Sequence, residues 1–191
     1  MKSDIRENII AAAQTTFKRY GFRKTTMDEI AYAARKGKSS LYYYFSSKEE
    51  VFQAVVEKEA AILRAEINSK VNERTSAMEK LNVYIHVRME GFKNWGNFYD
   101  ALKDEYLSDL DFIDKIRVKY DNNEIEFISE MIQEGITRKE FKNLNARITA
   151  KTVLIAMKGL EFPLLSEDAI NDNSIKEIDN MLEILFHGIC T

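Results

Sequence analysis

Apolar side chains recur every three to four positions along most of the chain, the spacing that places them on one face of an α-helix. The first such stripe runs through residues 5–20 and predicts a helix there. Gly21 follows and suits the left-handed position beyond a helix end. A capping box at Thr26–Glu29 predicts the start of a second, short helix, and residues 39–45 predict a third.

The connection between the second and third predicted helices, residues 35–38, is short. Within it, Gly37 is the residue that takes a left-handed conformation at least cost. Three helices over residues 4–45 with this spacing are typical of a helix-turn-helix. Leu41 and Phe45 lie four residues apart, so we expect both to pack on the first two helices.

Helical periodicity continues beyond this segment, and Ser-x-x-Glu capping boxes at Ser47, Ser76 and Ser174 support three further helix starts. The chain has one Pro and seven Gly, too few for the many turns of an all-β protein. We therefore predict an all-α fold. Its further helices are expected over residues 47–71, 76–95, 111–133, 145–162 and 174–187, with a short piece near 97–108.

Composition excludes several classes of protein. Hydrophobic residues make up 45% of the 191 positions, which is enough for a core and excludes a wholly disordered chain. One Cys and two His exclude a disulfide framework and disfavour a metal centre. Neither a secretory signal nor a run of roughly 20 apolar residues is present, so we expect a cytoplasmic protein with no membrane partner.

Motifs of common enzyme classes are also absent, and the acidic stretch of residues 100–111 has no His beside it and no regular metal-ligand spacing. The plain interpretation of that stretch is a solvated face, and the alternative is that one carboxylate enters a pocket and favours a cationic ligand. We expect no catalytic residue, no bound metal and no cofactor.

Charge is distributed unevenly along the chain. Residues 1–48 hold ten Lys and Arg against four Asp and Glu, a net charge of +6. The remaining residues hold 18 basic and 27 acidic side chains, a net charge of −9. A basic segment joined to an acidic one is typical of a polyanion-binding module attached to a second module, although a solvated basic face gives the same count.

The third predicted helix carries side chains suited to DNA. Lys38, Ser39 and Ser40 can donate hydrogen bonds at its start, and Tyr42 and Tyr43 add hydroxyls and flat rings. The alternative is that the tyrosines only pack in the core. Three consecutive tyrosines, 42–44, spread over about 300° of a helix, so at least one faces solvent or a partner.

The sequence here resembles the DNA-binding domain of the TetR family of bacterial regulators. The resemblance covers residues 5–55 and is carried by the ungapped strings TTMDEIAYAA (25–34), KSSLYYYF (38–45) and SKEEVF (47–52). The chain departs from the family pattern in the turn, where Arg35, Lys36 and Gly37 replace Gly-Val-Ser, and at Ser39, where Gly is frequent.

The resemblance implies a DNA interface. Thr26 and Lys48 would contact phosphates, the tyrosines would line the backbone, and Lys38 would read a guanine edge. The full set of expected DNA-binding residues is Thr26, Lys36, Lys38, Ser39, Ser40, Tyr42, Tyr43, Tyr44 and Lys48.

Two C-terminal segments have more apolar surface than one helix face can bury. Residues 153–162 are apolar nearly all round, and residues 175–189 carry a wide apolar stripe. We expect a homodimer interface here, formed by Val153, Met157, Leu160, Ile178, Leu182 and Leu185. The alternative is a central helix in a monomer. The resemblance favours a dimer whose two DNA-binding domains contact the two halves of a palindromic DNA site.

The middle of the chain is rich in aromatic and flexible side chains, which line ligand pockets but more often form a core. The candidate pocket residues are His86, Met89, Phe92, Trp95, Tyr99, Tyr120, Phe127 and Met131.

These observations predict a DNA-binding head at residues 1–48 and a ligand-binding and dimerisation body at residues 49–191. The expected function is a TetR-family regulator, a repressor that a small apolar or amphipathic effector releases from a palindromic operator. The helix over residues 47–71 would act as the lever between head and body. The alternatives are a DNA-associated protein that acts only through protein partners and, less favoured, a helical enzyme.

Overall fold

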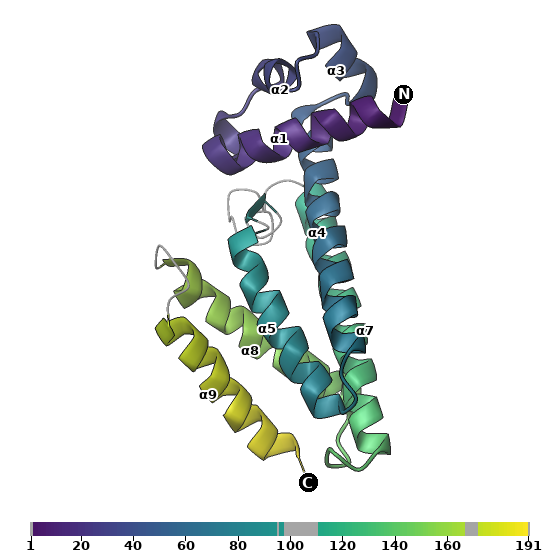
Figure 1. Ribbon diagram of the computed structural model, residues 1–191, viewed down its shortest axis with the longest axis vertical. Helices are drawn as coiled ribbons and strands as arrows, with labels where there is room; N and C mark the ends of the chain where they lie inside the picture. Colours follow the sequence, from purple (N-terminus) through teal and green to yellow (C-terminus); the bar gives the residue numbers. More distant parts are fainter. Residues whose placement is uncertain (1, 95, 98–110, 167–171, 191) are drawn as a thin grey trace. The chain divides into compact units, whose positions relative to one another are not determined.

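The computed structural model describes residues 2–94, 96–97, 111–166 and 172–190, and the regular secondary structure of these residues is α-helical (Figure 1). The all-α expectation is confirmed. The helices in chain order are α1 (Lys2–Lys24), α2 (Met27–Ala33), α3 (Lys38–Tyr44), α4 (Lys48–Asn72), α5 (Ala77–Asn94), α7 (Asp111–Thr137), α8 (Ala146–Ser166) and α9 (Asp172–Ile189). The predicted piece near 97–108 lies almost wholly outside the described residues.

The chain forms two compact units. The first joins Met1–Leu63 with Trp95–Ile113, and the second joins Arg64–Asn94 with Asp114–Thr191. Helix α4 contributes to both, because residues 48–63 belong to the first unit and residues 64–72 to the second.

In the first unit, α2 and α3 pack beside α1 and the start of α4 (Figure 1). The Phe17 and Phe52 rings meet edge to face, with centroids 5.0 Å apart, and join α1 to α4. Leu41 and Phe45 are buried, as expected. The apolar core of this unit includes Ile9, Ile10, Ala13, Phe17, Ile30, Ala31, Ala34, Leu41, Phe45, Val51, Phe52 and Val55.

A buried polar cluster also ties this unit together. The carboxylate of Glu59 on α4 accepts hydrogen bonds from the Gln14 amide at 2.9 Å and from the Asn97 amide at 2.8 Å. The Asn97 amide also donates to the Gln14 carbonyl oxygen at 3.1 Å. These bonds satisfy a charged group that is almost fully buried, which would otherwise be costly.

Of the two glycines predicted to take a left-handed conformation, one does so and the other does not. Gly21 has φ 75°, as expected for the residue that interrupts α1 near its end. Gly37, however, has φ −69° and is the N-cap of α3, and Arg35 is the residue with positive φ, at 53°. The expectation for Gly37 was therefore wrong, because the chain reverses two residues earlier, immediately after α2.

Local capping signals were largely correct. The Ser76 hydroxyl accepts from the Glu79 N–H at 3.1 Å, and the Glu79 carboxylate accepts from the Ser76 N–H at 3.3 Å. At the start of α4, the Ser47 hydroxyl accepts from the Glu50 N–H at 3.2 Å, but the Glu50 carboxylate bonds Ser46 instead of Ser47. Those Ser46 hydrogen bonds lower the pKa of Glu50.

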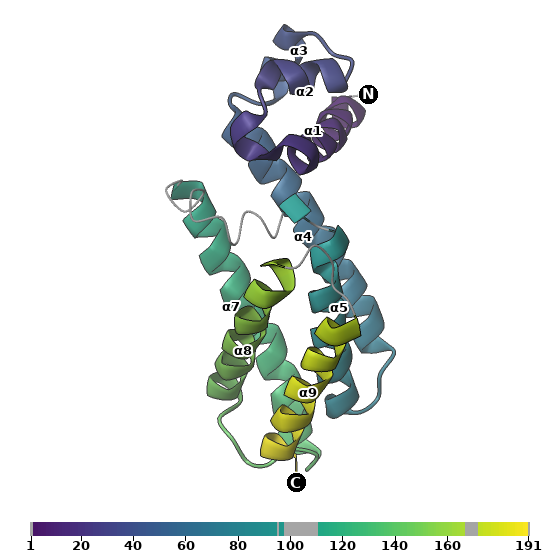
Figure 2. The same ribbon diagram turned by 90° about the vertical axis from the view of Figure 1, so that its left-hand side faces the viewer.

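The second unit contains α5, α7, α8 and α9 (Figure 2). Helices α7, α8 and α9 are longer than predicted, with α7 ending at Thr137, α8 at Ser166 and α9 beginning at Asp172, before the expected start at Ser174. Its apolar core includes Leu81, Tyr84, Ile85, Met89, Ile128, Met131, Ile132, Val153, Met157, Ile178 and Leu182.

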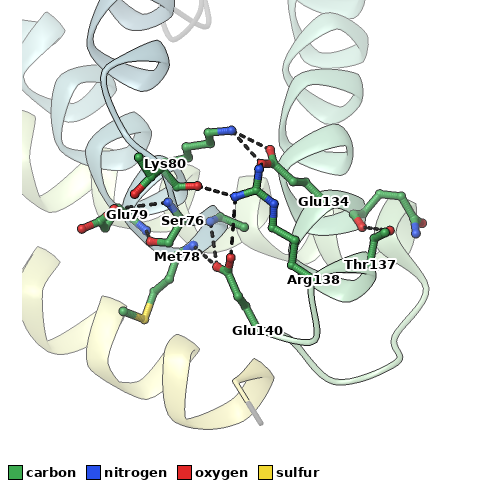
Figure 3. A network of polar contacts seen from close by, with 11 residues as sticks. Ser76, Met78, Glu79, Lys80, Glu134, Thr137, Arg138 and Glu140 are labelled. Carbon is green, nitrogen blue, oxygen red and sulfur yellow. Dashed lines mark hydrogen bonds and ion pairs between the residues drawn. The ribbon is translucent and has the colours of Figure 1, made fainter.

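A polar network joins the start of α5 to the end of α7 (Figure 3). The Glu140 carboxylate accepts from the Ala77 N–H at 2.7 Å and the Met78 N–H at 3.3 Å, so it caps α5 from a residue 63 positions away. The Lys80 ammonium donates to Glu134 at 2.7 Å. This hydrogen bond is the main reason that the pKa of Glu134 is lowered.

Candidate nucleic-acid interface

The α2–turn–α3 segment presents the expected DNA-binding side chains in the first unit. Helix α2 begins as predicted, because the Thr26 hydroxyl accepts from the Glu29 N–H at 3.3 Å. The Glu29 carboxylate in turn accepts from the Thr26 N–H at 2.7 Å and from its hydroxyl at 2.9 Å. A phosphate contact at Thr26 therefore requires that the phosphate replaces the Glu29 carboxylate at these donors.

Lys38 lies at the first position of α3, and its side chain is 62% exposed. The ammonium is paired with Asp28 on α2, with nitrogen–oxygen distances of 2.9 and 3.0 Å. The hydrogen bond to Asp28, together with its charge, raises the pKa of Lys38. Lys38 is thus a fully charged, exposed side chain whose present partner is a surface carboxylate, and DNA phosphates or bases can exchange with that partner at little cost.

The remaining α3 residues divide between surface and core. Tyr42 is 45% exposed and Tyr43 is 67% exposed, whereas Tyr44 is half-buried and meets the Tyr43 ring edge to face at 5.0 Å. Ser39 is exposed and Ser40 half-buried. The helical geometry argument was correct, because the three tyrosines do not share one environment.

Two of the predicted basic residues make hydrogen bonds within the first unit, Lys48 through its side chain and Lys36 through its backbone. The Lys48 ammonium donates to the Phe22 carbonyl oxygen at 2.8 Å and lies 4.3 Å from the centroid of the Phe22 ring. It therefore satisfies a carbonyl near the end of α1. Lys36 is half-buried in the turn, where its backbone N–H donates to the Ala31 carbonyl at 2.9 Å.

Two exposed residues beside this surface were not predicted. Tyr32 on α2 is 88% exposed, and Arg35 follows it in the turn. A hollow of about 690 Å³ lies between α1 and α2, with Arg19, Tyr20 and Tyr32 among its lining residues. The signal available in the sequence was an aromatic residue on the polar face of a short amphipathic helix.

The predicted pocket residues lie in different environments. Met89 and Met131 are buried, and Tyr120 and Phe127 are half-buried. His86 is half-buried and pairs with Asp179 on α9 at 3.0 Å. Trp95 and Tyr99 lie outside the described residues, as does the side chain of Phe92.

Sequence reasoning did not select the charged pair in this interior. Arg88 on α5 is buried, with 2% of its side chain exposed, and its guanidinium bonds Glu124 on α7. The available signal was an arginine inside the apolar segment of residues 83–89. Buried charges of this kind are uncommon unless they are paired.

Most of the predicted dimer residues pack inside the second unit. Val153, Met157, Ile178 and Leu182 are buried there, Leu185 is half-buried, and the side chain of Leu160 is not among those described. The exposed apolar side chains of the same helices are Ile148 and Ile155 on α8, 64% and 71% exposed, and Ile184 on α9, 66% exposed.

Within the described ranges, no group of three or more His, Cys, Asp or Glu could hold a metal ion. No helix in those ranges is both long and apolar enough to cross a bilayer.

Comparisons with known proteins agree on one kind of relative. Residues 9–55 match the family described as bacterial regulatory proteins, tetR family. A crystal structure of a transcriptional regulator from Cytophaga hutchinsonii is 31% identical, covers 97% of this chain and 98% of its own, and superposes with a TM-score of 0.80.

Two further relatives extend this result. The uncharacterized HTH-type transcriptional regulator YfiR of Bacillus subtilis is 27% identical over 78% of this chain and 74% of its own length. The transcriptional regulator FadR from Bacillus subtilis, solved in complex with stearoyl-CoA, is 20% identical, covers 95% of this chain and 98% of its own, and has a TM-score of 0.78.

Proposed function

The chain belongs to the TetR family of bacterial regulatory proteins and is a DNA-binding transcriptional regulator, and from this premise we propose that it is a dimeric repressor released from a palindromic operator by a small effector. The observation that carries the DNA-binding part is the exposed start of α3, with Lys38 and Tyr43 presented on a segment of net charge +6. We assign DNA binding to residues 1–48, and dimerisation and effector binding to residues 49–191.

The DNA contacts are proposed to have two roles. Tyr42 and Tyr43, which are exposed, approach the sugar-phosphate backbone and set the position of α3. Lys38 leaves Asp28 and donates to a guanine edge or to the adjacent phosphate. Lys48 stabilises the end of α1 through its hydrogen bond to the Phe22 carbonyl oxygen, in addition to any phosphate contact.

The dimer is proposed to form through the outer faces of α8 and α9. Ile148, Ile155 and Gly159 follow one exposed face of α8 at spacings of seven and four residues. Ile184 and Gly188 do the same on α9. Isoleucines beside glycines allow two helices to approach closely and bury apolar surface.

Effector release is proposed to act through α4, which contributes residues to both compact units. The effector must bind the DNA-competent and DNA-incompetent shapes with different affinities, because equal affinity shifts no equilibrium. The complex of the Bacillus subtilis regulator FadR with stearoyl-CoA supports the proposal that a protein of this fold binds a small-molecule effector.

The test is DNA binding by fluorescence anisotropy, with genomic fragments selected by the purified full-length protein. Affinity should fall steeply as salt rises, since neutralised phosphates release counterions. Lys38→Ala should weaken binding and relax the preferred base, while Lys119→Ala, a matched change of an exposed lysine on α7, should do neither.

Absence of binding to every fragment at low salt would overturn the DNA-binding proposal. Equal losses of DNA affinity in both variants would show that the start of α3 is not the DNA interface. A reporter gene placed behind a selected fragment then separates repression from activation.

A further inference from the structure

Helix α2 ends in a tight turn that fixes the backbone of Arg35. The Arg35 N–H donates to the Tyr32 carbonyl oxygen at 3.0 Å, and the Lys36 N–H donates to the Ala31 carbonyl oxygen at 2.9 Å. These two hydrogen bonds define a Schellman motif, in which the residue after the helix end takes a left-handed conformation and is usually glycine. Here that residue is Arg35, with φ 53°. The turn is well bonded, but it holds an arginine in a conformation that favours glycine.

The strain does not by itself mark a functional residue. Lys139 has φ 63° at the end of α7, where its N–H donates to the Ile136 carbonyl oxygen at 3.1 Å. The Glu140 N–H donates to the Gly135 carbonyl oxygen at 2.9 Å, so the same motif holds a basic residue there. The surroundings of the Arg35 side chain must therefore show whether its strain serves a function.

The Arg35 side chain lies on a surface with cations and no carboxylate. A hollow of about 520 Å³ beside the turn is lined by Tyr32, Ala33, Arg35 and Lys36. Arg35 is exposed and Lys36 is half-buried. Neither side chain forms an ion pair or a hydrogen bond in the part of the chain that the structure describes. Two neighbouring positive charges without a partner favour the binding of an anion.

Tyr32 lines both this hollow and the larger one between α1 and α2. The two carboxylates of the larger hollow already have partners, because Asp28 bonds Lys38 and Glu29 bonds Thr26. The Tyr32 side chain is 88% exposed, so its ring adds little to the core of the first unit. Its hydroxyl is able to donate a hydrogen bond to a phosphate oxygen.

We propose that Tyr32 and Arg35 bind phosphates of the DNA backbone and extend the DNA interface beyond α3; this rests on the proposed function, in which residues 1–48 bind an operator. The Arg35 guanidinium donates two parallel hydrogen bonds to one phosphate. The Tyr32 hydroxyl donates to the same phosphate or to the next one. Lys36 adds a positive charge beside them.

The position of the two residues selects phosphates over bases. In a helix-turn-helix the recognition helix enters the major groove, while the preceding helix crosses the sugar-phosphate backbone. Tyr32 is near the end of that preceding helix, α2, and Arg35 lies in the turn, before Lys38 at the start of α3. The contacts therefore hold α3 in place beside the bases without reading their sequence.

The test uses a variant with opposite effects on stability and on DNA binding. Arg35→Gly relieves the left-handed strain, so the free energy of unfolding should rise, and a purely structural role predicts no loss of DNA affinity. By anisotropy on the full-length protein with a selected genomic fragment, we expect affinity to fall roughly tenfold at low salt, the usual effect of losing one charge-assisted hydrogen bond. The slope of log affinity against log salt should become shallower by about one, since one fewer phosphate is neutralised.

Three further variants separate charge, hydroxyl and strain. Lys139→Gly is the matched control, because it places glycine in the same motif of the second unit, and it should leave DNA affinity and the salt slope unchanged. Arg35→Lys should restore the salt slope and only part of the affinity, since an ammonium lacks the fork that matches a phosphate. Tyr32→Phe should lower affinity severalfold without changing the salt slope, because it removes a neutral donor.

Unchanged DNA affinity in Arg35→Gly, or an equal loss in Lys139→Gly, would overturn this inference, and the proposed function would stand if Lys38→Ala still weakened binding. A changed preference among fragments in Arg35→Gly would also overturn it, since Arg35 would then contact a base. Unchanged affinity in Tyr32→Phe would remove Tyr32 from the interface. If the unmodified protein bound no fragment at low salt, the proposed function and this inference would fall together.

Discussion

The turn between α2 and α3 depends on Arg35, a non-glycine residue with φ 53°. Side chains in this region of backbone space cost about 1–2 kcal/mol, because Cβ approaches the following carbonyl oxygen. The pattern of the TetR family has glycine at this position. Gly37, which the sequence suggested for the role, instead has φ −69° and starts α3 without a side-chain cap.

Arg35→Gly should therefore stabilise the protein, by about 1 kcal/mol once the entropy of glycine in the unfolded chain is subtracted. The measurement is chemical unfolding. Lys36→Gly is the matched control, since Lys36 is not among the positive-φ residues and its replacement should destabilise. Equal losses of stability in both variants would contradict the strain argument.

A second residue-scale prediction concerns Asp28, which holds Lys38 in the free protein. Asp28→Asn removes both the competing carboxylate and a negative charge from the proposed DNA surface. DNA affinity should rise severalfold at low salt, because one more cation is available to neutralise phosphate. Glu130→Gln, an exposed change on α7, should leave affinity unchanged.

The gain from Asp28→Asn should vanish when Lys38 is also replaced by Ala, since the two residues act through one pair. A gain that persists without Lys38 would show that Asp28 opposes DNA by itself.

At the scale of helices, α8 and α9 each have one face in the core and one face exposed. The core faces carry Val153, Met157 and Leu182, and the exposed faces carry Ile155 and Ile184. The helix period places these residues on opposite sides, but period alone does not say which side meets the rest of the chain and which meets a second copy.

Ile155→Glu and Ile184→Glu should therefore each yield a folded monomer, because the charge lies on the proposed interface and remains solvated when the dimer separates. Leu182→Glu should instead destabilise the fold by several kcal/mol, since Leu182 is 2% exposed within the chain. Sedimentation measures the association state, and circular dichroism measures whether the protein is folded.

Val118→Glu on α7, at a side chain that is 61% exposed, is the control and should leave the association state unchanged. A dimer that survives both isoleucine changes would place the interface elsewhere.

The contact between α5 and α7 near Lys80 should make stability depend on pH. The pKa of Glu134 is lowered from 4.5 by its hydrogen bond to Lys80, so folding favours the ionised carboxylate. The resulting stabilisation is present above the ordinary glutamate range and is lost as pH falls through the lowered pKa.

Lys80→Met should cost about 1 kcal/mol at neutral pH, since the pair is partly buried, and the cost should shrink as the pH falls through that range. Lys119→Met, at an exposed lysine of the same unit, should show no such change with pH. Unfolding curves at a series of pH values provide the comparison, and a cost independent of pH would exclude the ion pair as its source.

At the scale of the whole molecule, the charge distribution confines DNA attraction to one part of the chain, and a continuous helix connects that part to the rest. The first 48 residues carry net charge +6 and the remainder −9, so the acidic part adds no attraction for DNA. Helix α4 is continuous from Lys48 to Asn72 and belongs to both compact units. An effector signal that begins in the second unit therefore has a covalent, helical path to the first.

This gives a reciprocal prediction. If a small effector lowers operator affinity by some factor, operator DNA must lower the affinity for that effector by the same factor. Anisotropy and calorimetry on the same protein measure the two factors. A small molecule that binds tightly without changing operator affinity would contradict its role as effector.

By itself, the sequence determined the helical fold, the helix-turn-helix and the family. These depend on signals within a few residues of one another: the apolar period, the capping boxes at Thr26 and Ser76, and an ungapped motif. Only the tertiary structure decided that Arg35 bears the positive φ, that Glu140 caps α5, and which faces of α8 and α9 stay exposed. The pairing of Arg88 with Glu124 joins residues 36 apart in the chain. The physical reason is that burial and ion pairing depend on which distant segments meet, and no local pattern in the chain records that.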